Sequence, residues 1–381
     1  MKIRNNQKPL FKKSFFIGIL LLIGLGGLAG CVSGTATIPK GWSGGVVADN
    51  NLYIGSMAGK LVALELPGGN RSWVAPLETI KQPSGGFGCA PAPTSVAIYG
   101  SPAVSGNLTY IGGYNGNFYA FAPGRTEPRW IYPRQGTIGA PIIGGPAVAG
   151  DKVYFGAANG KVYALNATDG FKEWEFTNGD KIWSSPAVAE GTLFIGSFDK
   201  KLYALDARNG SKKWEYTSQG AIVATPVIDK GTVYFGSFDR FLYALNASDG
   251  SLKWKFEAGG WFWAKPVIYN NVIYAPNLDG KVYALDMQNG NKLSEFDLGV
   301  QSHISSSPVM VDNQVIAATE AGVIWALDTE TLQKKLLASL GEKVYASLAS
   351  RLGTVYVHTA KDTLYAVDAR SGATTKFNIS Q

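Results

Sequence analysis

A segment of the type Tyr-Ala-Leu-Asp returns about every 40 residues, and this repeat constrains the fold more than any other feature of the chain. Its plainest copies are Tyr203–Asp206 and Tyr283–Asp286. Eight copies align on their alanines, which are Ala63, Ala120, Ala164, Ala204, Ala244, Ala284, Ala326 and Ala366. A period of about 40 residues in which the repeated unit has strand character indicates propeller blades.

Each repeat is consistent with four strands, and residues 183–217 serve as the type. The expected strands begin at Ser185-Pro186 and cover Leu193–Ser197, Lys201–Leu205 and Lys213–Tyr216. The second and third are apolar on both faces, which is typical of strands that are covered on both sides. The sequence therefore predicts an all-β, eight-bladed propeller of four-stranded antiparallel blades over residues 42–381.

The turns of the repeat carry their own signals. Asp206 to Gly210 places an aspartate that can bond its own backbone before a glycine that tolerates positive φ. The pairs Asp199-Lys200 and Asp239-Arg240 fall between the second and third strands, where we expect polar hairpin turns. We therefore interpret these aspartates as turn residues rather than ligands.

The N-terminus has the layout of a secretory signal. Residues 2–13 are basic, Ser14–Gly27 is an apolar run, and Leu28-Ala29-Gly30-Cys31 follows. This ending resembles a bacterial lipobox, which implies a diacylglycerol on the Cys31 thiol and cleavage before it. The predicted plan is a signal peptide over residues 1–30 and a lipidated tether over residues 31–41.

An uncleaved membrane anchor with an incidental cysteine is the alternative, although the apolar run is short for a spanning helix. In both cases the propeller lies outside the cytoplasm. Val32, rather than Asp, follows the cysteine. The resemblance then implies the periplasmic face of the outer membrane in a cell with two membranes, and otherwise the outer face of the cytoplasmic membrane.

The net charge of +7 does not indicate nucleic-acid binding. Five of the 35 basic residues lie in residues 1–30, which hold no acid, so 30 basic and 28 acidic residues are left. We expect no nucleic-acid partner.

Two irregular features stand outside the repeat. Cys89 is the second cysteine, and a lipid on Cys31 would leave it as a free thiol or as half of an intermolecular disulfide. It lies in a Pro- and Gly-rich insertion over residues 76–100, which is either a functional loop or a surface excursion.

The segment Ala204-Leu205-Asp206, with Gly210 and Trp214 after it, resembles the repeat of pyrroloquinoline-quinone-like propellers. In that family the tryptophan docks on the neighbouring blade. The resemblance assigns blade docking to Trp73, Trp130, Trp174, Trp214 and Trp254. The last three repeats depart from it, with Leu293, Lys335 and Thr375 near the corresponding place.

Quinoprotein dehydrogenases share this repeat, so a redox enzyme or a quinone-binding accessory subunit is one alternative function. Those enzymes carry an adjacent cysteine pair, a bound calcium and an aspartate base, whereas this sequence has no Cys-Cys pair. The two histidines, His303 and His358, cannot form a metal cluster unaided. We expect no catalytic residue, no metal and no cofactor.

Aromatic residues before the first strands of the later blades are the candidate contact residues, because such side chains are enriched at interfaces. The candidates are Trp183, Trp261, Phe262, Trp263, His303 and Tyr345. Alternatively, Trp183 and Trp263 plug the central channel. A surface that binds glycans or other ligands is a further possibility.

A lipid-anchored propeller of this size resembles the BamB family, the lipoproteins of the outer-membrane β-barrel assembly machine. That resemblance implies a monomeric, non-enzymatic scaffold that binds envelope proteins and is held to the bilayer by its acyl anchor.

Overall fold

The computed structural model describes residues 41–77, 96–299 and 302–379, and these described residues form one compact unit. The described residues form 32 strands joined by turns and loops, and none of them is helical. The predicted signal peptide and tether, Cys31, Cys89 and most of the 76–100 insertion lie outside the described residues.

The strands follow one another in groups of four. The first strands of the groups are β1 (Val46–Ala48), β5 (Ala103–Ser105), β9 (Ala147–Ala149), β13 (Ala187–Ala189), β17 (Val227–Asp229), β21 (Val267–Tyr269), β25 (Val309–Val311) and β29 (Ala349–Arg351). The second strands are β2 (Asn51–Gly55), β6 (Leu108–Gly112), β10 (Lys152–Gly156), β14 (Thr192–Gly196), β18 (Thr232–Gly236), β22 (Val272–Pro276), β26 (Gln314–Ala318) and β30 (Thr354–His358). The third strands are β3 (Lys60–Glu65), β7 (Phe118–Phe121), β11 (Lys161–Asn166), β15 (Lys201–Asp206), β19 (Phe241–Asn246), β23 (Lys281–Asp286), β27 (Val323–Asp328) and β31 (Thr363–Asp368). The fourth strands are β4 (Asn70–Pro76), β8 (Trp130–Tyr132), β12 (Lys172–Thr177), β16 (Lys212–Thr217), β20 (Leu252–Glu257), β24 (Lys292–Asp297), β28 (Lys334–Ser339) and β32 (Thr374–Asn378).

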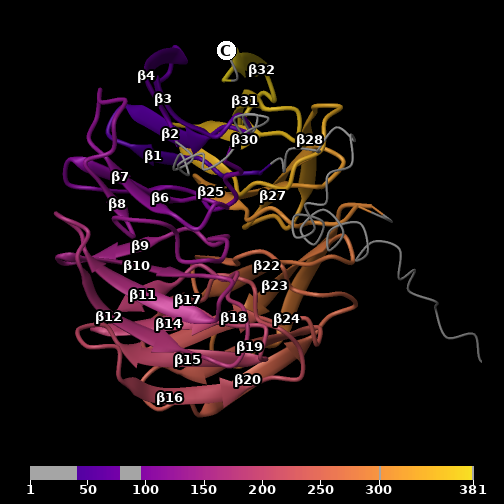
Figure 1. Ribbon diagram of the computed structural model, residues 1–381. Helices are drawn as coiled ribbons and strands as arrows, with labels where there is room; N and C mark the ends of the chain where they lie inside the picture. Colours follow the sequence, from indigo (N-terminus) through magenta and orange to yellow (C-terminus); the bar gives the residue numbers. More distant parts are fainter. Residues whose placement is uncertain (1–40, 78–95, 300–301, 380–381) are drawn as a thin grey trace, which may run out of the picture. The chain divides into compact units, whose positions relative to one another are not determined.

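Each group of four consecutive strands forms one antiparallel sheet (Figure 1). The eight sheets are the blades of an eight-bladed β-propeller, which confirms the fold predicted from the repeat. The first strands of neighbouring blades lie next to one another, so they surround the axis of the ring. The fourth strands form its outer edge.

The hydrophobic core is divided into eight clusters, and each cluster lies between two consecutive blades. The alanine of each repeat contributes to this packing, and Ala204 and Ala244 are fully buried. A methyl group at the centre of the third strand allows the next sheet to approach closely. Burial of a single leucine- or isoleucine-sized side chain stabilises the fold by about 1.5–3 kcal/mol, so these clusters account for most of the ring's cohesion.

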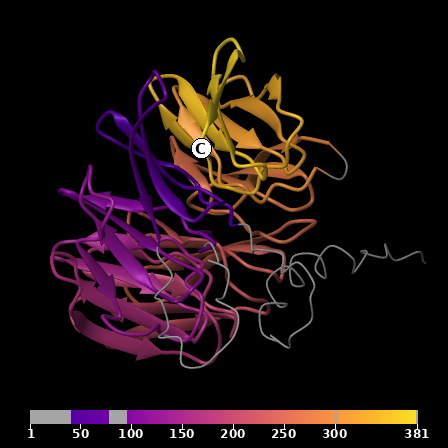
Figure 2. The same ribbon diagram turned by 45° about the horizontal axis from the view of Figure 1, so that its top comes forward.

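The ring closes between blade eight and blade one without an exchanged strand. Leu52 and Ile54 of blade one pack in one cluster with Tyr356 and Leu364 of blade eight. The two blades lie side by side, indigo against yellow, in Figure 2. Closure therefore depends on packing and on side-chain contacts rather than on strand pairing across the ends of the chain.

Polar contacts reinforce this closure. His358 is buried, and its Nδ1 lies 2.8 Å from the carbonyl oxygen of Ser43. The backbone N–H of Met57 donates to the Asp362 carboxylate over 2.9 Å, and the same carboxylate lies 3.0 Å from His358 Nε2. These contacts tie blade one to the turn between β30 and β31.

The turn after the third strand has the geometry that the sequence predicts. The Asp206 carboxylate accepts from the backbone N–H of Arg208 over 2.9 Å, and Gly210 N–H donates to the Asp206 carbonyl over 2.8 Å. Gly210 has a φ of +75°, in the left-handed region.

This glycine is required for a second reason, because it lies under an indole ring. A Cβ atom at Gly210 would lie 2.6 Å from the Trp174 ring of the preceding blade. Gly191, in the turn between β13 and β14, has a similar φ of +70° but no atom within 4 Å of its Cβ position. A substitution at Gly191 therefore introduces backbone strain alone, whereas the same substitution at Gly210 adds a steric contact with the indole.

We predict that Gly210→Ala destabilises the propeller more than Gly191→Ala does. Both substitutions cost about 1–2 kcal/mol from the left-handed backbone. Only Gly210→Ala displaces the indole, which adds about 1–3 kcal/mol of overpacking. Chemical denaturation of the two variants measures the difference, and equal destabilisation would show that the indole is not packed against this turn.

Candidate functional site

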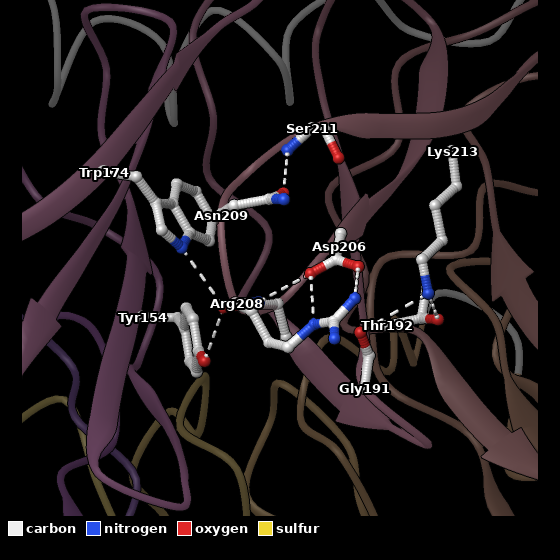
Figure 3. Close-up of polar contacts among 10 residues, drawn as sticks. Tyr154, Trp174, Gly191, Thr192, Asp206, Arg208, Asn209, Ser211 and Lys213 are labelled. Atoms are coloured by element: carbon white, nitrogen blue, oxygen red, sulfur yellow. Dashed lines mark hydrogen bonds and ion pairs between the residues drawn. The ribbon is translucent and has the colours of Figure 1, made fainter.

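The outer strands carry the tryptophans that the repeat assigns to blade docking, and the structure places each of the five against the next blade. The Trp174 indole N–H donates to the Ala207 carbonyl oxygen over 3.1 Å (Figure 3). The Tyr154 hydroxyl donates to the same oxygen over 2.9 Å. One carbonyl of blade four thus receives two donors from blade three.

The other four indoles make the same kind of bond. Trp73 donates to the carbonyl of Arg125, Trp130 to Ala167, Trp214 to Ala247 and Trp254 to Met287, over distances of 2.7 to 3.1 Å. The glycines under the indoles of blades two to five are Gly170, Gly210, Gly250 and Gly290. The docking contacts of Trp130, Trp174, Trp214 and Trp254 therefore combine a hydrogen bond with van der Waals packing on a glycine backbone.

The last three blades use other contacts, and in blade six the docking register lies one residue beyond Leu293. Strand pairing places Ser294, rather than Leu293, opposite Ala284, because β24 has a bulge at the same point as the tryptophan-bearing strands. Leu293 points outward and is 53% exposed. In blade seven, Lys335 Nζ donates to the carbonyl of Arg370 in blade eight over 2.6 Å.

Phe377 takes the docking role at the closure of the ring. A Cβ at Gly69 of blade one, where φ is +70°, would lie 2.1 Å from the Phe377 ring. Phe377 lies two residues beyond Thr375. Thr375 pairs with Ala366 and so stands at the register that the tryptophans occupy in the earlier blades.

The loops that join one blade to the next lie on the same face as the turns between the second and third strands, and we call this face the loop face. In blades four and six, for example, a backbone hydrogen bond connects the joining loop to the turn between the second and third strands. Phe198 N–H donates to the Lys181 carbonyl over 3.1 Å, and Leu278 N–H to the Trp261 carbonyl over 3.0 Å. Loop residues are thereby held in matching positions around the ring.

The aspartates of these turns are fully engaged. Asp199 accepts from the Tyr203 hydroxyl over 2.6 Å, from Gly179 N–H over 3.1 Å and from Lys201 N–H over 3.0 Å. Asp239 and Asp279 make the corresponding bonds in blades five and six. The structure therefore supports the turn interpretation of these carboxylates.

Eight equivalent residues, one from each joining loop, form what we call the rim positions. They are Trp42, Tyr99, Ile143, Trp183, Val223, Trp263, Ser305 and Tyr345. Trp42 packs against Tyr99 at 4.6 Å and Tyr345 at 5.5 Å between ring centroids. Trp183 and Trp263 belong to blades four and six and meet edge-to-face at 6.5 Å, because the intervening blade contributes only Val223.

The aromatic cluster of blades four to six extends outward from this pair. It consists of Trp183, Phe198, Phe238, Trp261 and Trp263, all partly exposed. Phe198 contacts Trp183 at 4.6 Å, and Phe238 stacks on Trp261 at 5.0 Å and on Trp263 at 5.6 Å. Lys181 Nζ lies 4.6 Å from the Phe198 centroid and 5.5 Å from that of Trp183, so a cation covers one side of the cluster.

The predicted contact residues therefore divide into three groups. Trp183, Trp261 and Trp263 lie together in the aromatic cluster, whereas Tyr345 lies apart beside Trp42. Phe262 is a wrong prediction, because it is 1% exposed and packs in the core between blades five and six. Side chains alternate along the joining loop, so the residue between two surface tryptophans points inward.

His303 holds a joining loop in place. Its Nδ1 donates to the carbonyl oxygen of Leu278, and its own carbonyl accepts from Glu320 N–H over 2.8 Å. Burial raises the pKa of Glu320, while His303, Ser305 and Lys343 act to lower it. Burial is the largest of these effects, so the pKa of Glu320 lies above its ordinary value, and its Oε1 atom is buried without a hydrogen-bond partner among the described residues.

Among residues 41–77, 96–299 and 302–379, no three His, Cys, Asp or Glu side chains are grouped so as to hold a metal ion. The same part of the chain contains no helix that could cross a bilayer. Sequence reasoning missed Trp42, Tyr99, Phe198 and Phe238. The repeat position alone could have found the first two, since they align with Trp183 and Trp263.

Comparison with known proteins gives one family. A family model described as outer membrane protein assembly factor BamB matches residues 33–181 and 158–377. No curated protein sequence matches the chain.

Solved structures share the fold. BamB from Moraxella catarrhalis is 18% identical, with a TM-score of 0.68 over 89% of this chain and 94% of that chain. The computationally designed Ika8 protein is 16% identical, with a TM-score of 0.70 over 89% of this chain and 96% of that chain. At these identities the likeness concerns the fold alone.

We predict that Asp199→Asn lowers the pKa of Tyr203. Burial, and then the Asp199 carboxylate, raise that pKa above its ordinary value. A raised pKa stabilises the folded protein fully below pH ~10, and this contribution is lost as the pH rises further. Removing the carboxylate should shift one tyrosine in the phenolate absorbance titration to lower pH.

Asp169→Asn is the matched control, because Asp169 lies in an exposed turn and, among the described residues, its carboxylate accepts only from the backbone N–H of Phe171, over 3.1 Å. If Asp199→Asn and Asp169→Asn give the same titration curve, the Tyr203–Asp199 bond does not control this phenol.

Proposed function

This chain belongs to the family described as outer membrane protein assembly factor BamB, and on that premise we propose that it is a non-enzymatic interaction scaffold of the cell envelope that assists the assembly of outer-membrane proteins. A ring of eight blades held by apolar cores between neighbours offers a rigid platform. The chemistry of such a protein lies in its surface loops rather than in its fold.

The aromatic cluster of blades four to six is the observation that carries the proposal. Tryptophan and other aromatic side chains dominate the binding energy of protein interfaces, particularly when they cluster. Here the backbone bonds of the loop face fix Trp261, and Phe238 stacks on its ring, so the cluster is ordered before a partner arrives. Preorganisation of this kind reduces the entropic cost of association.

The N-terminal sequence supports an attachment to the membrane. We propose that residues 1–30 are removed and that Cys31 carries the lipid, which leaves the propeller at a membrane surface. Stable anchoring requires more than one acyl chain, and a diacylglycerol with a further acyl group satisfies this requirement.

We predict that Trp261→Ala weakens the capture of an envelope partner by about 30-fold or more, the loss expected for a hot-spot residue worth ~2 kcal/mol. Quantitative pull-down from solubilised membranes with the full chain measures this loss. Phe171→Ala is the control, because Phe171 is 59% exposed but lies in a turn between third and fourth strands, away from the loop face.

Two results would contradict the scaffold role. One is the recovery of no specific envelope protein by the unaltered chain. The other is equal capture by the Trp261→Ala and Phe171→Ala variants.

We predict that Cys31→Ala abolishes acylation and leaves the chain at its precursor mass. Intact-protein mass spectrometry of membrane fractions reads both quantities. Cys89→Ala is the matched control, since it removes the other cysteine and should leave the lipid in place. A mature mass without lipid in the unaltered chain would exclude the anchor.

A further inference from the structure

The turn between the second and third strands of blade seven carries an acid where the other blades carry uncharged residues. We call the equivalent residues of these turns the turn positions. They are Met57, Tyr114, Ala158, Phe198, Phe238, Leu278, Glu320 and Ala360. At every turn position but Met57, the backbone N–H donates to a carbonyl of the preceding joining loop, so the positions match in structure as well as in sequence. Glu320 is the one ionisable carboxyl group among them.

The rim position of blade seven is also polar. Ser305 is the one rim residue that is neither aromatic nor aliphatic. Beside it in the same blade, Glu320 Oε1 is buried and has no hydrogen-bond partner within residues 41–77, 96–299 and 302–379. Blade seven thus holds a carboxyl group that is removed from water, with one oxygen that lacks a donor.

The backbone of Glu320 joins the loops on both sides of blade seven. Its N–H donates to the His303 carbonyl over 2.8 Å, in the loop before the blade, and its carbonyl accepts from Val344 N–H over 3.2 Å, in the loop after it. In blade four the bond equivalent to the second one runs from Ile222 to Ser197, one residue before the turn position. Blade seven therefore places on the acidic residue itself a bond that blade four places on its neighbour.

The charged and polar groups around Glu320 come from both joining loops. Burial raises the pKa of Glu320, and His303, Ser305 and Lys343 lower it by less. The Lys343 side chain is exposed, so water screens its charge. Glu342, the residue before it, is directed to blade eight, where its carboxylate accepts from two hydroxyl groups. The surroundings of Glu320 therefore favour its neutral form.

We propose that Glu320 is an acid-dependent latch: its neutral carboxyl group stays buried and holds the joining loops on both sides of blade seven, and its charged carboxylate leaves that position and releases them. A buried carboxylate without a donor is costly. Movement of the side chain towards water and the exposed Lys343 ammonium relieves that cost. The same movement pulls on the backbone bonds to His303 and Val344, so the two loops loosen together.

The direction of the pH response follows from the cause of the shift. Burial opposes the charge of Glu320, so its pKa in the folded protein lies above the ~4.3 of an ordinary glutamate. The buried position is stabilised fully below pH ~4.3, and this contribution is lost as the pH rises through the value of the folded state. The latch is therefore closed in acid and open in alkali.

This latch goes beyond the proposed scaffold role and does not depend on it. It requires only the propeller, so its test uses neither an envelope partner nor a membrane.

The first experiment is chemical denaturation of the full chain in detergent at pH 4.5 and pH 8. Glu320→Gln has nearly the shape of the neutral carboxyl group and cannot ionise. We expect it to raise the folding equilibrium constant relative to the unaltered chain by at least threefold more at pH 8 than at pH 4.5. A purely structural role for residue 320 would give the same ratio at both values.

Glu342→Gln is the matched control, because it alters a neighbouring glutamate whose pKa is shifted the other way. Burial raises the pKa of Glu342, but hydrogen bonds, with that from Thr359 Oγ1 over 2.6 Å among them, hold it below the ordinary value. We therefore expect Glu342→Gln to lower the folding equilibrium constant at pH 8 relative to pH 4.5.

Hydrogen exchange locates the response. The amides of Glu320 and Val344 make the two latch bonds, so their protection, corrected for the intrinsic exchange rate at each pH, reports whether the loops are held. We expect both to lose at least fivefold in protection between pH 5 and pH 8 in the unaltered chain and to keep it in Glu320→Gln. The amide of Phe198, at the turn position of blade four, should keep its protection in both proteins.

Three outcomes would overturn the proposal. The amides of Glu320 and Val344 could be equally protected at pH 5 and pH 8 in the unaltered chain. They could lose protection in Glu320→Gln as they do in the unaltered chain. Glu320→Gln could change the folding equilibrium constant by the same factor at both pH values. Glu320→Leu, which introduces the residue of blade six at this position, repeats both measurements without a carboxyl group if the glutamine variant does not fold.

Discussion

The contact between an outer-strand indole and the backbone of the next blade's turn is the interaction on which the order of this ring depends. The sheets pack through apolar side chains, which have no directional preference, so packing alone does not set how one blade is rotated against the next. The indole adds a directional bond, as Trp174 shows with the Ala207 carbonyl. A glycine with positive φ lies beneath it, and any larger residue would push the blades apart.

This interaction divides the ring into two parts. Tryptophans dock blades one to five on their successors, whereas blades six to eight have Ser294, Lys335 and Thr375 at the corresponding register. The bulge that presents the docking residue is kept in blade six but lies two residues earlier on the third strand of blade seven, between Ile324 and Trp325. The aromatic cluster spans blades four to six, so it lies where the docked part of the ring meets the part held by other contacts.

The sequence predicted the number of blades, the strand positions and the turns, because each depends on local chemistry that recurs with the repeat. It did not predict the roles of Phe377 and Phe262. Phe377 replaces a tryptophan two residues away from the expected position, which only the pairing of β31 with β32 reveals. Phe262 is buried because the joining loop alternates its side chains, and an irregular segment gives no periodic signal of that alternation. Trp183 of blade four contacts Trp263 of blade six, and the residue between them in blade five is the smaller Val223. This contact involves three blades, so the pattern within one repeat does not predict it.

Hydrogen exchange of the full chain, followed by mass spectrometry of peptides from each outer strand, tests most directly whether the indole contacts hold the blades in place. An outer strand is hydrogen-bonded on one side only, so its protection reports how firmly it is held. Slow exchange is expected for β12, β16 and β20, which carry docked tryptophans, and faster exchange for β24 and β28, which lack them. Equal protection of all five strands would contradict the account, because the apolar cores alone would then suffice to fix the ring.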